Sequence, residues 1–174
     1  MSCGSAIKLT HVESGGKYIL RSDERQLQSG SGQQLVTAEQ NKRSPKGLWQ
    51  VREGTNAQFC EAGTPIKCGS IIRLMHLETG SNLHTHGIRS PISSQHEVTG
   101  FGQQGEGDSG DDWKVICDAG GSYFSGGDEY WMRDKIVQFK SVATNRLLGA
   151  SSTVKFTEQN CGRGCPILNQ ESPR

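Results

Sequence analysis

The sequence predicts an all-β domain, and three observations carry this prediction. Only 32% of the 174 residues are hydrophobic while 23 are glycine, a composition typical of a domain rich in turns. Apolar side chains alternate with polar ones over short segments, and no long segment shows helical spacing. Finally, one unit recurs along the chain at a constant offset. A chain of this length is most simply one domain that buries its own core.

The recurring unit is most visible at the start of each copy. Residues 3–12 read CGSAIKLTHV, and residues 68–77, which lie 65 positions later (68 − 3 = 65), read CGSIIRLMHL. A further step of 65 reaches Val137-Gln-Phe139 in the third and most degenerate copy. Trp49 and Trp113 stand at equivalent positions near the ends of the first two copies. The chain therefore contains three related units in tandem.

Each unit has the pattern of short strands separated by turns. In Ile7-Lys-Leu9 and Ile72-Arg-Leu74 the apolar side chains are two residues apart, so they face one side of a strand. Clusters such as Glu13–Gly16 and Glu78–Ser81 are typical of turns. The alignment places Tyr18, Leu83 and Leu148 at equivalent positions.

Three units of this kind predict a β-trefoil. None could bury its apolar face alone, so we expect them to close into one barrel around a shared core. A seven-strand sandwich would not produce the 65-residue repetition. A single domain over residues 1–174 would hold copies at about 3–60, 68–117 and 131–170. The predicted core consists of the recurring apolar positions: Ile7, Leu9, Tyr18, Val36, Trp49, Ile72, Leu74, Leu83, Val98, Trp113, Val137, Phe139 and Leu148.

The stretch GFGQQGEG (residues 100–107) begins with G-x-G-x-x-G, the pattern of a dinucleotide-binding turn. That pattern needs a strand before it and a helix that opens after it. Here it lies between two predicted strands, Glu97-Val98-Thr99 and Trp113-Lys-Val115, and an acidic loop follows Gly105. We therefore predict a turn whose glycines adopt positive φ, and no nucleotide site.

Six cysteines at dispersed positions predict disulfides in an oxidising compartment. A zinc site would need paired Cys-x2-Cys knuckles or nearby histidines, and only Cys161-Gly-Arg-Gly-Cys165 comes close. In each copy the opening strand should lie antiparallel to the closing strand, which places the first residue beside the end of the copy. The expected pairs are Cys3–Cys60, Cys68–Cys117 and, for the remaining two, Cys161–Cys165.

The candidate metal ligands are histidine side chains and the carboxylates of one acidic loop. His84 and His86 are two residues apart and could offer a metal two imidazoles from one strand face, with His76 and His96 as further candidates. No third ligand has an obvious spacing. We therefore favour the interpretation that these histidines bind no metal and lie on the outer face or in a hydrogen-bonded loop. The loop Glu106–Asp112 lacks the spacing of an EF-hand, and we expect it to be solvated and mobile, without metal.

No residue pattern predicts catalysis or a cofactor. No serine sits in a G-x-S-x-G elbow, the cysteines are assigned to bridges, and no carboxylate pair stands out, so we expect no enzyme activity. Trp49 and Trp113 are expected in the barrel core. Tyr123, Tyr130 and Trp131 lie near paired glycines and are expected to be exposed, where an aromatic patch could bind a peptide or a glycan.

Charge and hydropathy exclude two classes of partner. The net charge is +1, the sequence pI is about 7.6, and the basic residues are scattered, so we expect no nucleic-acid partner. The longest apolar runs are far too short to span a membrane.

Several motifs occur in the order found in a known family. The repeats, together with SGSGQQ at residues 29–34, NLHTH at residues 82–86 and QHEV at residues 95–98, resemble the MIR-domain fold. More narrowly, they resemble the stromal-cell-derived-factor-2 family. The resemblance runs from Cys3 to about Leu168 and includes four of the cysteines; Cys161 and Cys165 are additional to the family pattern.

The resemblance implies a non-catalytic protein of the endoplasmic reticulum lumen. Such a protein would work with a J-domain co-chaperone and the lumenal Hsp70 on unfolded clients, in quality control and the unfolded-protein response. Related repeats occur in protein O-mannosyltransferases and in inositol-trisphosphate and ryanodine receptors. Because trefoils commonly bind sugars and these repeats accompany O-mannosylation, a glycan-binding trefoil is the alternative, by analogy of fold alone. No signal peptide follows Met1, and residues 171–174 read ESPR in place of a K/H-D-E-L retention signal.

Overall fold

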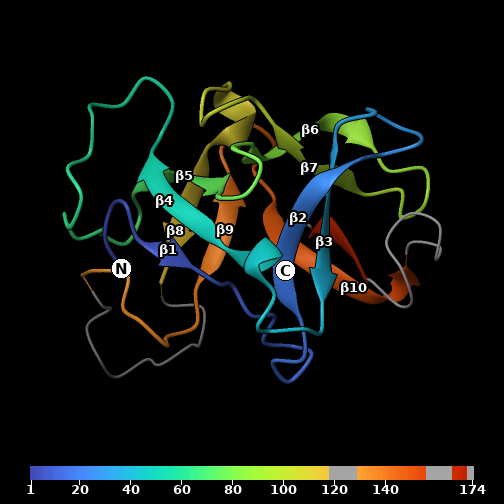
Figure 1. Cartoon of the computed structure of the whole chain (residues 1–174), viewed down its shortest axis with the longest axis horizontal. Coiled ribbons are helices and arrows are strands. Elements are labelled where there is room, and N and C mark those ends of the chain that lie inside the picture. Colours follow the sequence, from blue (N-terminus) through green and yellow to red (C-terminus); the bar gives the residue numbers. More distant parts are fainter. Residues whose placement is uncertain (118–128, 156–165, 172–174) are drawn as a thin grey trace.

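Eleven strands, all paired antiparallel, belong to one sheet in the computed structural model, which describes residues 1–117, 129–155 and 166–171 (Figure 1). Two 3-10 turns, η1 (Pro45–Gly47) and η2 (Ser109–Asp111), precede the last strands of the first two repeats. The described ranges contain no α-helix. The strands are β1 (Ala6–Ile7), β2 (Ile19–Gln26), β3 (Gln34–Glu39), β4 (Trp49–Glu53), β5 (Ile71–His76), β6 (Asn82–Arg89), β7 (His96–Phe101), β8 (Trp113–Ile116), β9 (Gln138–Ser141), β10 (Leu147–Lys155) and β11 (Pro166–Glu171).

The pairing of these strands has threefold character. The closing strand of the first repeat, β4, lies between β1 and β5, and the closing strand of the second, β8, lies between β5 and β9. Each repeat also contributes a hairpin, β2–β3, β6–β7 or β10–β11. The three hairpins meet because β3, β7 and β11 pair with one another. This arrangement confirms the predicted β-trefoil.

The centre of the barrel is built on two tryptophans. Trp49 and Trp113 are fully buried, and each indole Nε1 donates to a hairpin carbonyl, that of Leu20 at 3.3 Å and that of Leu83 at 2.8 Å. The buried members of the predicted core are Ile7, Val36, Trp49, Ile72, Leu74, Leu83, Val98, Trp113 and Phe139. Leu9, Tyr18, Val137 and Leu148 are only partly buried and pack against that core.

One predicted equivalence was wrong. In each hairpin one leucine belongs to the second residue pair from the open end: Leu20 with Ala38, Leu83 with Gly100 and Leu148 with Gln170. Leu20, not Tyr18, is therefore the counterpart of Leu83 and Leu148. The constant offset of 65 therefore shortens to 63 (83 − 20) between the hairpins of the first two repeats. Other core residues that the pattern did not predict include Ile19, Leu35, Val51, Ile66, Val115 and Trp131.

The glycine-rich stretch forms a turn between β7 and η2. Gly102 and Gly105 have φ of +78° and +81°, a region that favours glycine. A Cβ on Gly102 would lie 1.8 Å from the carbonyl oxygen of Glu106, so no other residue fits there without a shift of the backbone. The stretch thus has the positive φ angles expected of a tight turn. In the described part of the chain, no helix has the length and apolar character needed to cross a membrane.

His76 is fully buried beside Trp49 and makes two hydrogen bonds. Its Nε2 lies 2.9 Å from the Lys46 carbonyl and its Nδ1 lies 3.0 Å from Thr79 Oγ1. Burial lowers the pKa of His76, and the bond to the Lys46 carbonyl opposes that change only in part. The imidazole is therefore held neutral inside the barrel wall.

This burial predicts a loss of stability in mild acid. The unfolded chain takes up a proton near pH 6.5, about the ordinary histidine pKa, whereas the folded chain resists it. The free energy of unfolding should thus fall as pH drops below that value and level off below the folded pKa. Urea unfolding at pH 7.5 and 5.5 measures the loss, which should be smaller in His76→Gln. An equal loss in both proteins would show that His76 does not cause it.

Candidate functional site

Two disulfides join the start of a repeat to its end. Cys3 bonds Cys60 with a Cα–Cα distance of 6.0 Å, and Cys68 bonds Cys117 at 5.6 Å. These are the pairs expected from the order of the strands. Cys161 and Cys165 lie outside the described residues.

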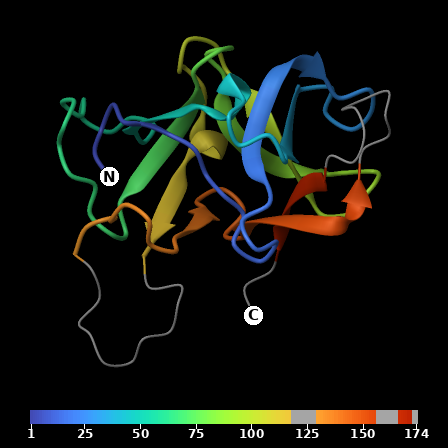
Figure 2. The same cartoon turned by 60° about the horizontal axis from the view of Figure 1, so that its bottom comes forward.

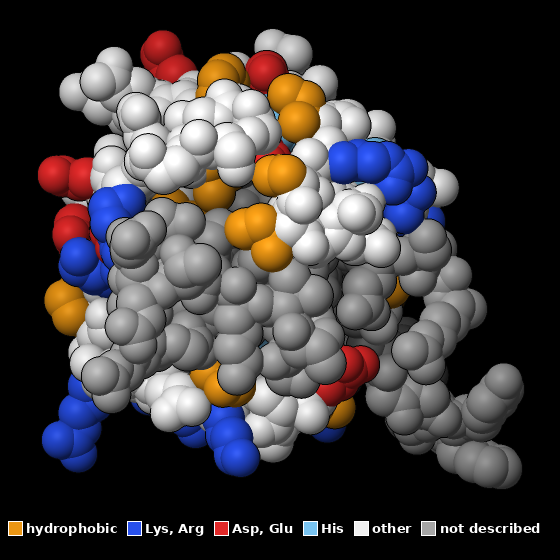
Figure 3. All heavy atoms as spheres, turned by 90° about the vertical axis from the view of Figure 1, so that its right-hand side faces the viewer, with side chains coloured by type: hydrophobic (Ala, Val, Ile, Leu, Met, Phe, Trp, Pro, Cys, Tyr) orange, Lys and Arg blue, Asp and Glu red, His pale blue; other side chains and the backbone are white. Residues whose placement is uncertain are grey.

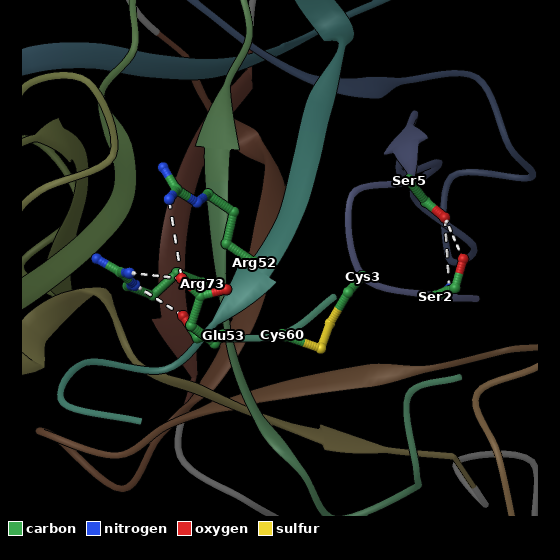
Figure 4. Close-up of a disulfide and its surroundings, with 7 residues drawn as sticks. All are labelled: Ser2, Cys3, Ser5, Arg52, Glu53, Cys60 and Arg73. Atoms are coloured by element: carbon green, nitrogen blue, oxygen red, sulfur yellow. Dashed lines mark hydrogen bonds and ion pairs between the residues drawn. A yellow bond between two sulfur atoms is a disulfide. The ribbon is translucent and has the colours of Figure 1, made fainter. Parts of the chain in front are cut away.

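The first disulfide lies beyond the end of β4, and Figure 4 shows its surroundings. There Arg52 and Arg73, from the neighbouring strands β4 and β5, each approach the Glu53 carboxylate at 3.8 Å. The disulfide closes the first repeat on itself, and the ion pair of Arg73 with Glu53 joins the end of that repeat to the second.

A buried polar cluster lies at the base of the second hairpin. His84 on β6 is 3% exposed, and its Nδ1 lies 2.8 Å from Oδ1 of Asp111, which is fully buried. Asn82 donates from Nδ2 to the other oxygen of Asp111 at 3.1 Å. Asp108, which is exposed, approaches the same imidazole nitrogen at 3.6 Å. The cluster therefore connects β6 to the loop before β8.

The acidic side chains of that loop bond to its own amides, and its last three residues are buried, contrary to the expectation of a solvated segment. Asp108 accepts from the Gly110 amide at 2.7 Å and Asp111 accepts from the Asp108 amide at 3.0 Å, which together cap the turn η2. Asp112 is buried and accepts from the Thr55 amide at 2.7 Å. Burial raises the pKa of Asp112, and the bonds from Thr55 oppose the change. The carboxylates replace water as the partners of buried amides.

A second buried carboxylate joins the first two repeats. Glu97 on β7 is buried, and its Oε2 lies 3.4 Å from His86 Nε2 and accepts from the Ser31 amide at 3.2 Å. Gly30 has a φ of +74°, and a Cβ there would lie 1.9 Å from Glu97 Oε1. Only glycine allows this close approach without a shift of the carboxylate.

The three motifs of the family resemblance meet at this junction. Gln34 donates to Ser22 and Thr79, at 2.7 and 2.8 Å, and accepts from Ser81 at 2.9 Å. Gln33 accepts from Thr99 at 2.6 Å. Ser31 of SGSGQQ and His86 of NLHTH both contact the Glu97 carboxylate of QHEV, so the three motifs, far apart in the sequence, meet between the first and second hairpins. Their polar residues hold the repeats together.

In the first hairpin, the positions that correspond to His84 and His86 are occupied by two side chains whose charges are opposite to each other. By strand register, Arg21 and Asp23 are the counterparts of His84 and His86, and both are buried. Asp23 pairs with Arg21 and with Arg25, and Lys46 approaches at 3.6 Å. Burial alone would raise the pKa of Asp23, but the hydrogen bonds from Arg25 and the charge of Arg21 outweigh it and lower that pKa well below its usual range.

The cluster around His84 has the donor set of a cation site. Ligand atoms of His84, Asp108 and Asp111 lie within 4.8 Å of one another. Asp111 already accepts from Asn82 and from the Asp108 amide, and it lies within hydrogen-bonding distance of His84. His84 is buried on strand β6 and contacts the loop through Asp111, so it lies neither on the outer face nor in a loop, as the sequence had suggested. His86 does not belong to this group of ligand atoms.

The expected aromatic surface patch is not formed as predicted. Trp131 is only 4% exposed, since its ring packs edge-on against Phe139 with centroids 5.4 Å apart and its amide donates to the Ile66 carbonyl at 2.8 Å. Tyr130 is half-buried, and Lys67 Nζ lies 5.8 Å from the centre of its ring. Tyr123 lies outside the described residues. The nearby glycines suggested exposure, but Trp131 belongs to the core.

The end of the molecule on the right of Figure 1 faces the viewer in Figure 3. On the coloured part of this face, hydrophobic side chains are scattered among polar ones, and basic and acidic groups both occur. No basic stripe of the kind that follows a nucleic-acid backbone is visible on that part.

The described residues thus form a β-trefoil in which a disulfide closes each of the first two repeats. A family model described as "MIR domain" matches residues 1–165. The chain is 42% identical over 151 residues to stromal cell-derived factor 2 of Mus musculus, a match over 87% of this chain and 66% of that protein. The chain therefore belongs to the MIR-domain proteins and, among them, to the stromal-cell-derived-factor-2 family.

Solved structures agree with this assignment. The chain matches the SDF2-like protein from Arabidopsis thaliana with a TM-score of 0.86 and 30% identity, over 100% of this chain and 89% of that one. It also matches the S. cerevisiae protein O-mannosyltransferase Pmt1-Pmt2 complex with a TM-score of 0.80, over 100% of this chain and 24% of that chain. At 24% identity the second match shows the fold alone. The chain spans just under two thirds of the length of the curated relative, 66%.

Proposed function

We propose that this protein is a non-catalytic binding module of the endoplasmic reticulum lumen that acts with a J-domain co-chaperone and the lumenal Hsp70 in protein quality control and the unfolded-protein response. The observation that carries the proposal is the 42% identity to stromal cell-derived factor 2 over 87% of the chain, combined with the role implied by that family. The two disulfides support a compartment in the secretory pathway, where such bonds persist.

The use of the buried polar groups also supports a binding role. Catalytic acids and bases usually sit in a cleft with a pKa matched to their task. Here the carboxylates of Glu97 and Asp111 lie inside the molecule and are bonded to amides and imidazoles of neighbouring elements. Glu97 thereby joins the first two hairpins and Asp111 fixes the loop before β8 to β6, which leaves the surface of the trefoil for binding.

The proposal is tested by affinity capture from a lumenal extract of eukaryotic cells. The folded chain, immobilised at low density, should retain a J-domain protein in stoichiometric amount together with Hsp70, as identified by mass spectrometry. The reduced and alkylated chain serves as the control, since an unfolded polypeptide is itself an Hsp70 client. Recovery of Hsp70 from the control alone, with no J-domain protein on the folded chain, would refute the proposal.

The glycan-binding alternative gains no support from the described residues. Its basis is the likeness to the O-mannosyltransferase complex, which at 24% identity concerns the fold only. Saturable binding on a glycan array, without recovery of a co-chaperone from the extract, would favour that alternative over the proposed function.

A further inference from the structure

Three potential ligand atoms gather between strand β6 and the loop before β8. They are Nδ1 of His84 and one carboxylate oxygen each from Asp108 and Asp111, and all lie within 4.8 Å of one another. Figure 2 shows the short yellow coil of η2, which carries Asp111 and leads into β8. We call these three side chains the His84 group.

The separations within the His84 group are close to those of ligands around one ion. His84 Nδ1 lies 2.8 Å from Asp111 Oδ1 and 3.6 Å from Asp108 Oδ1. Zinc bonds of about 2.0–2.2 Å would place neighbouring ligand atoms about 3.0–3.4 Å apart, depending on the coordination number. The two separations lie on either side of that range. Small shifts, which are easiest for the exposed Asp108, would therefore bring all three atoms to bonding distance of an ion.

The two carboxylates of this group have no basic side chain beside them. By strand register Arg21 is the counterpart of His84 in the first repeat, and its guanidinium pairs there with the Asp23 carboxylate. Within the described ranges, Asp108 and Asp111 form no ion pair with a lysine or an arginine, and His84 is their partner. The second repeat thus places two carboxylates around an imidazole where the first repeat has a permanent cation.

Asn82 gives an independent indication that a ligand belongs here. It is completely buried, two residues before His84 on β6, and its Nδ2 lies 3.1 Å from Asp111 Oδ2, so its amide faces that carboxylate. Its Oδ1 is also buried and has no hydrogen-bond donor in the part of the chain that the structure describes. Leaving such an oxygen unsatisfied is costly.

A cation would remove this cost. The two ends of the Asn82 amide are nearly equal in shape. A half-turn of the amide would bring Oδ1 beside Asp111, where two oxygens face each other and a positive ion between them would bind both.

Two glycines of the loop leave room for the group. A Cβ at Gly107 would lie 1.8 Å from Asp111 Oδ2, and a Cβ at Gly110 would lie 2.3 Å from His84 Cε1. Neither glycine adopts the left-handed φ that by itself favours this residue. The close approach of the loop to the His84 group therefore explains both glycines.

The imidazole is held in place while one side of the group stays open. The His84 ring packs against Phe101 with centroids 4.7 Å apart and edge-on against His86 at 5.2 Å. The side chain of His84 is 4% exposed, whereas that of Asp108 is 58% exposed. An ion could thus enter past Asp108 and keep a water molecule as a further ligand, an arrangement common for zinc with three protein ligands.

We propose that the His84 group binds a divalent transition-metal ion, with zinc as the best match, through His84 Nδ1 and one oxygen each of Asp108 and Asp111. Mixed nitrogen and oxygen ligands suit zinc, whereas calcium takes oxygen ligands. In the metal-free chain Nδ1 donates its proton towards the Asp111 carboxylate. In the metal-bound chain the imidazole proton would reside on Nε2, and the ion would join β6 to the loop before β8. This site does not depend on the proposed function.

Calorimetric titration with zinc chloride tests the site. The folded chain, treated with a chelator and dialysed, should bind one zinc ion saturably at the His84 group. Asp108→Asn should weaken that binding at least about tenfold, since even the loss of a residue that only supports a metal ligand costs this much. Asparagine still caps η2 by accepting from the Gly110 amide. Glu106→Gln removes the same charge from an exposed side chain of the same loop, so it should bind zinc as wild type does.

Nitrogen NMR of the histidine rings locates the bound ion. The Nδ1 of His84 should carry the proton before zinc is added, and Nε2 should carry it afterwards. Zinc binding that leaves the His84 nitrogens unchanged, equal zinc affinity of wild type and Asp108→Asn, or no zinc binding at all would overturn the proposal. Calcium binding as tight as zinc binding would do the same, because it would show that the imidazole is not a ligand.

The nitrogen resonances of wild-type His84 decide the question even if Asp108→Asn fails to fold. Capture of the co-chaperone is measured in a separate experiment, so the zinc site and the proposed function can each fail alone.

Discussion

Trp113→Ala is expected to lower the free energy of unfolding by about 3–5 kcal/mol, the usual cost of deleting a fully buried aromatic side chain. Trp113 is completely inaccessible to solvent, and its indole nitrogen donates to the Leu83 carbonyl at 2.8 Å. The substitution removes the side chain from the shared core and leaves that carbonyl without its donor. Denaturant unfolding followed by circular dichroism measures the loss.

Trp113→Phe separates the two contributions. The phenyl ring keeps most of the buried apolar volume but cannot donate to Leu83, so it should cost about 1–3 kcal/mol, the range for an unsatisfied buried acceptor with some loss of packing. Lys114→Ala, on the exposed face of the same strand, is the matched control and should change little. A loss below 1 kcal/mol for the alanine variant would contradict the central role given to this tryptophan.

The double variant Cys68→Ala/Cys117→Ala is expected to lose about 4 kcal/mol of stability, because its disulfide closes a loop of about 50 residues in the unfolded chain. The separation of the two cysteines is 49 residues. Guanidinium unfolding under oxidising conditions, compared with wild type, measures the loss. Wild type treated with a thiol reductant should lose at least as much, since it also loses the Cys3–Cys60 bond.

Cys161→Ala/Cys165→Ala serves as the control for that experiment. If these two cysteines pair as the sequence predicts, their loop is short, and removing the bond should cost about 2 kcal/mol, half the effect of the long bridge. Equal losses in the two double variants would contradict the chain-entropy explanation of the long bridge.

The sequence predicted the barrel better than the hairpins, and the reason is the spacing of the repeats. Trp49 and Trp113 occupy equivalent strands that pair with similar neighbours, so their burial followed from the repetition alone. Between those strands, however, turns of unequal length change the offset. The prediction therefore selected Tyr18 where the structure places Leu20.

The buried polar cluster could not be predicted from one sequence. Aspartate is almost never fully buried unless it is paired, and the partners of Asp111 come from strand β6 and from the start of its own turn. The motifs NLHTH and QHEV pointed to the correct region, but nothing in the spacing of either showed that Glu97 would meet Gly30. Trp131 was misplaced because its neighbours in sequence are polar and glycine-rich, whereas its neighbours in space are Ile66 and Phe139.

The junction between Gly30 and Glu97 has a consequence for how the three units can be combined. A symmetric protein built from three identical copies of the second unit would carry a histidine pair at each hairpin and would lack the glycine loop that receives the carboxylate. A design from three first units would bring together three sets of Arg21 and Asp23. The first two units are therefore not interchangeable at this junction, since the glycine loop of one is fitted to the carboxylate of the other.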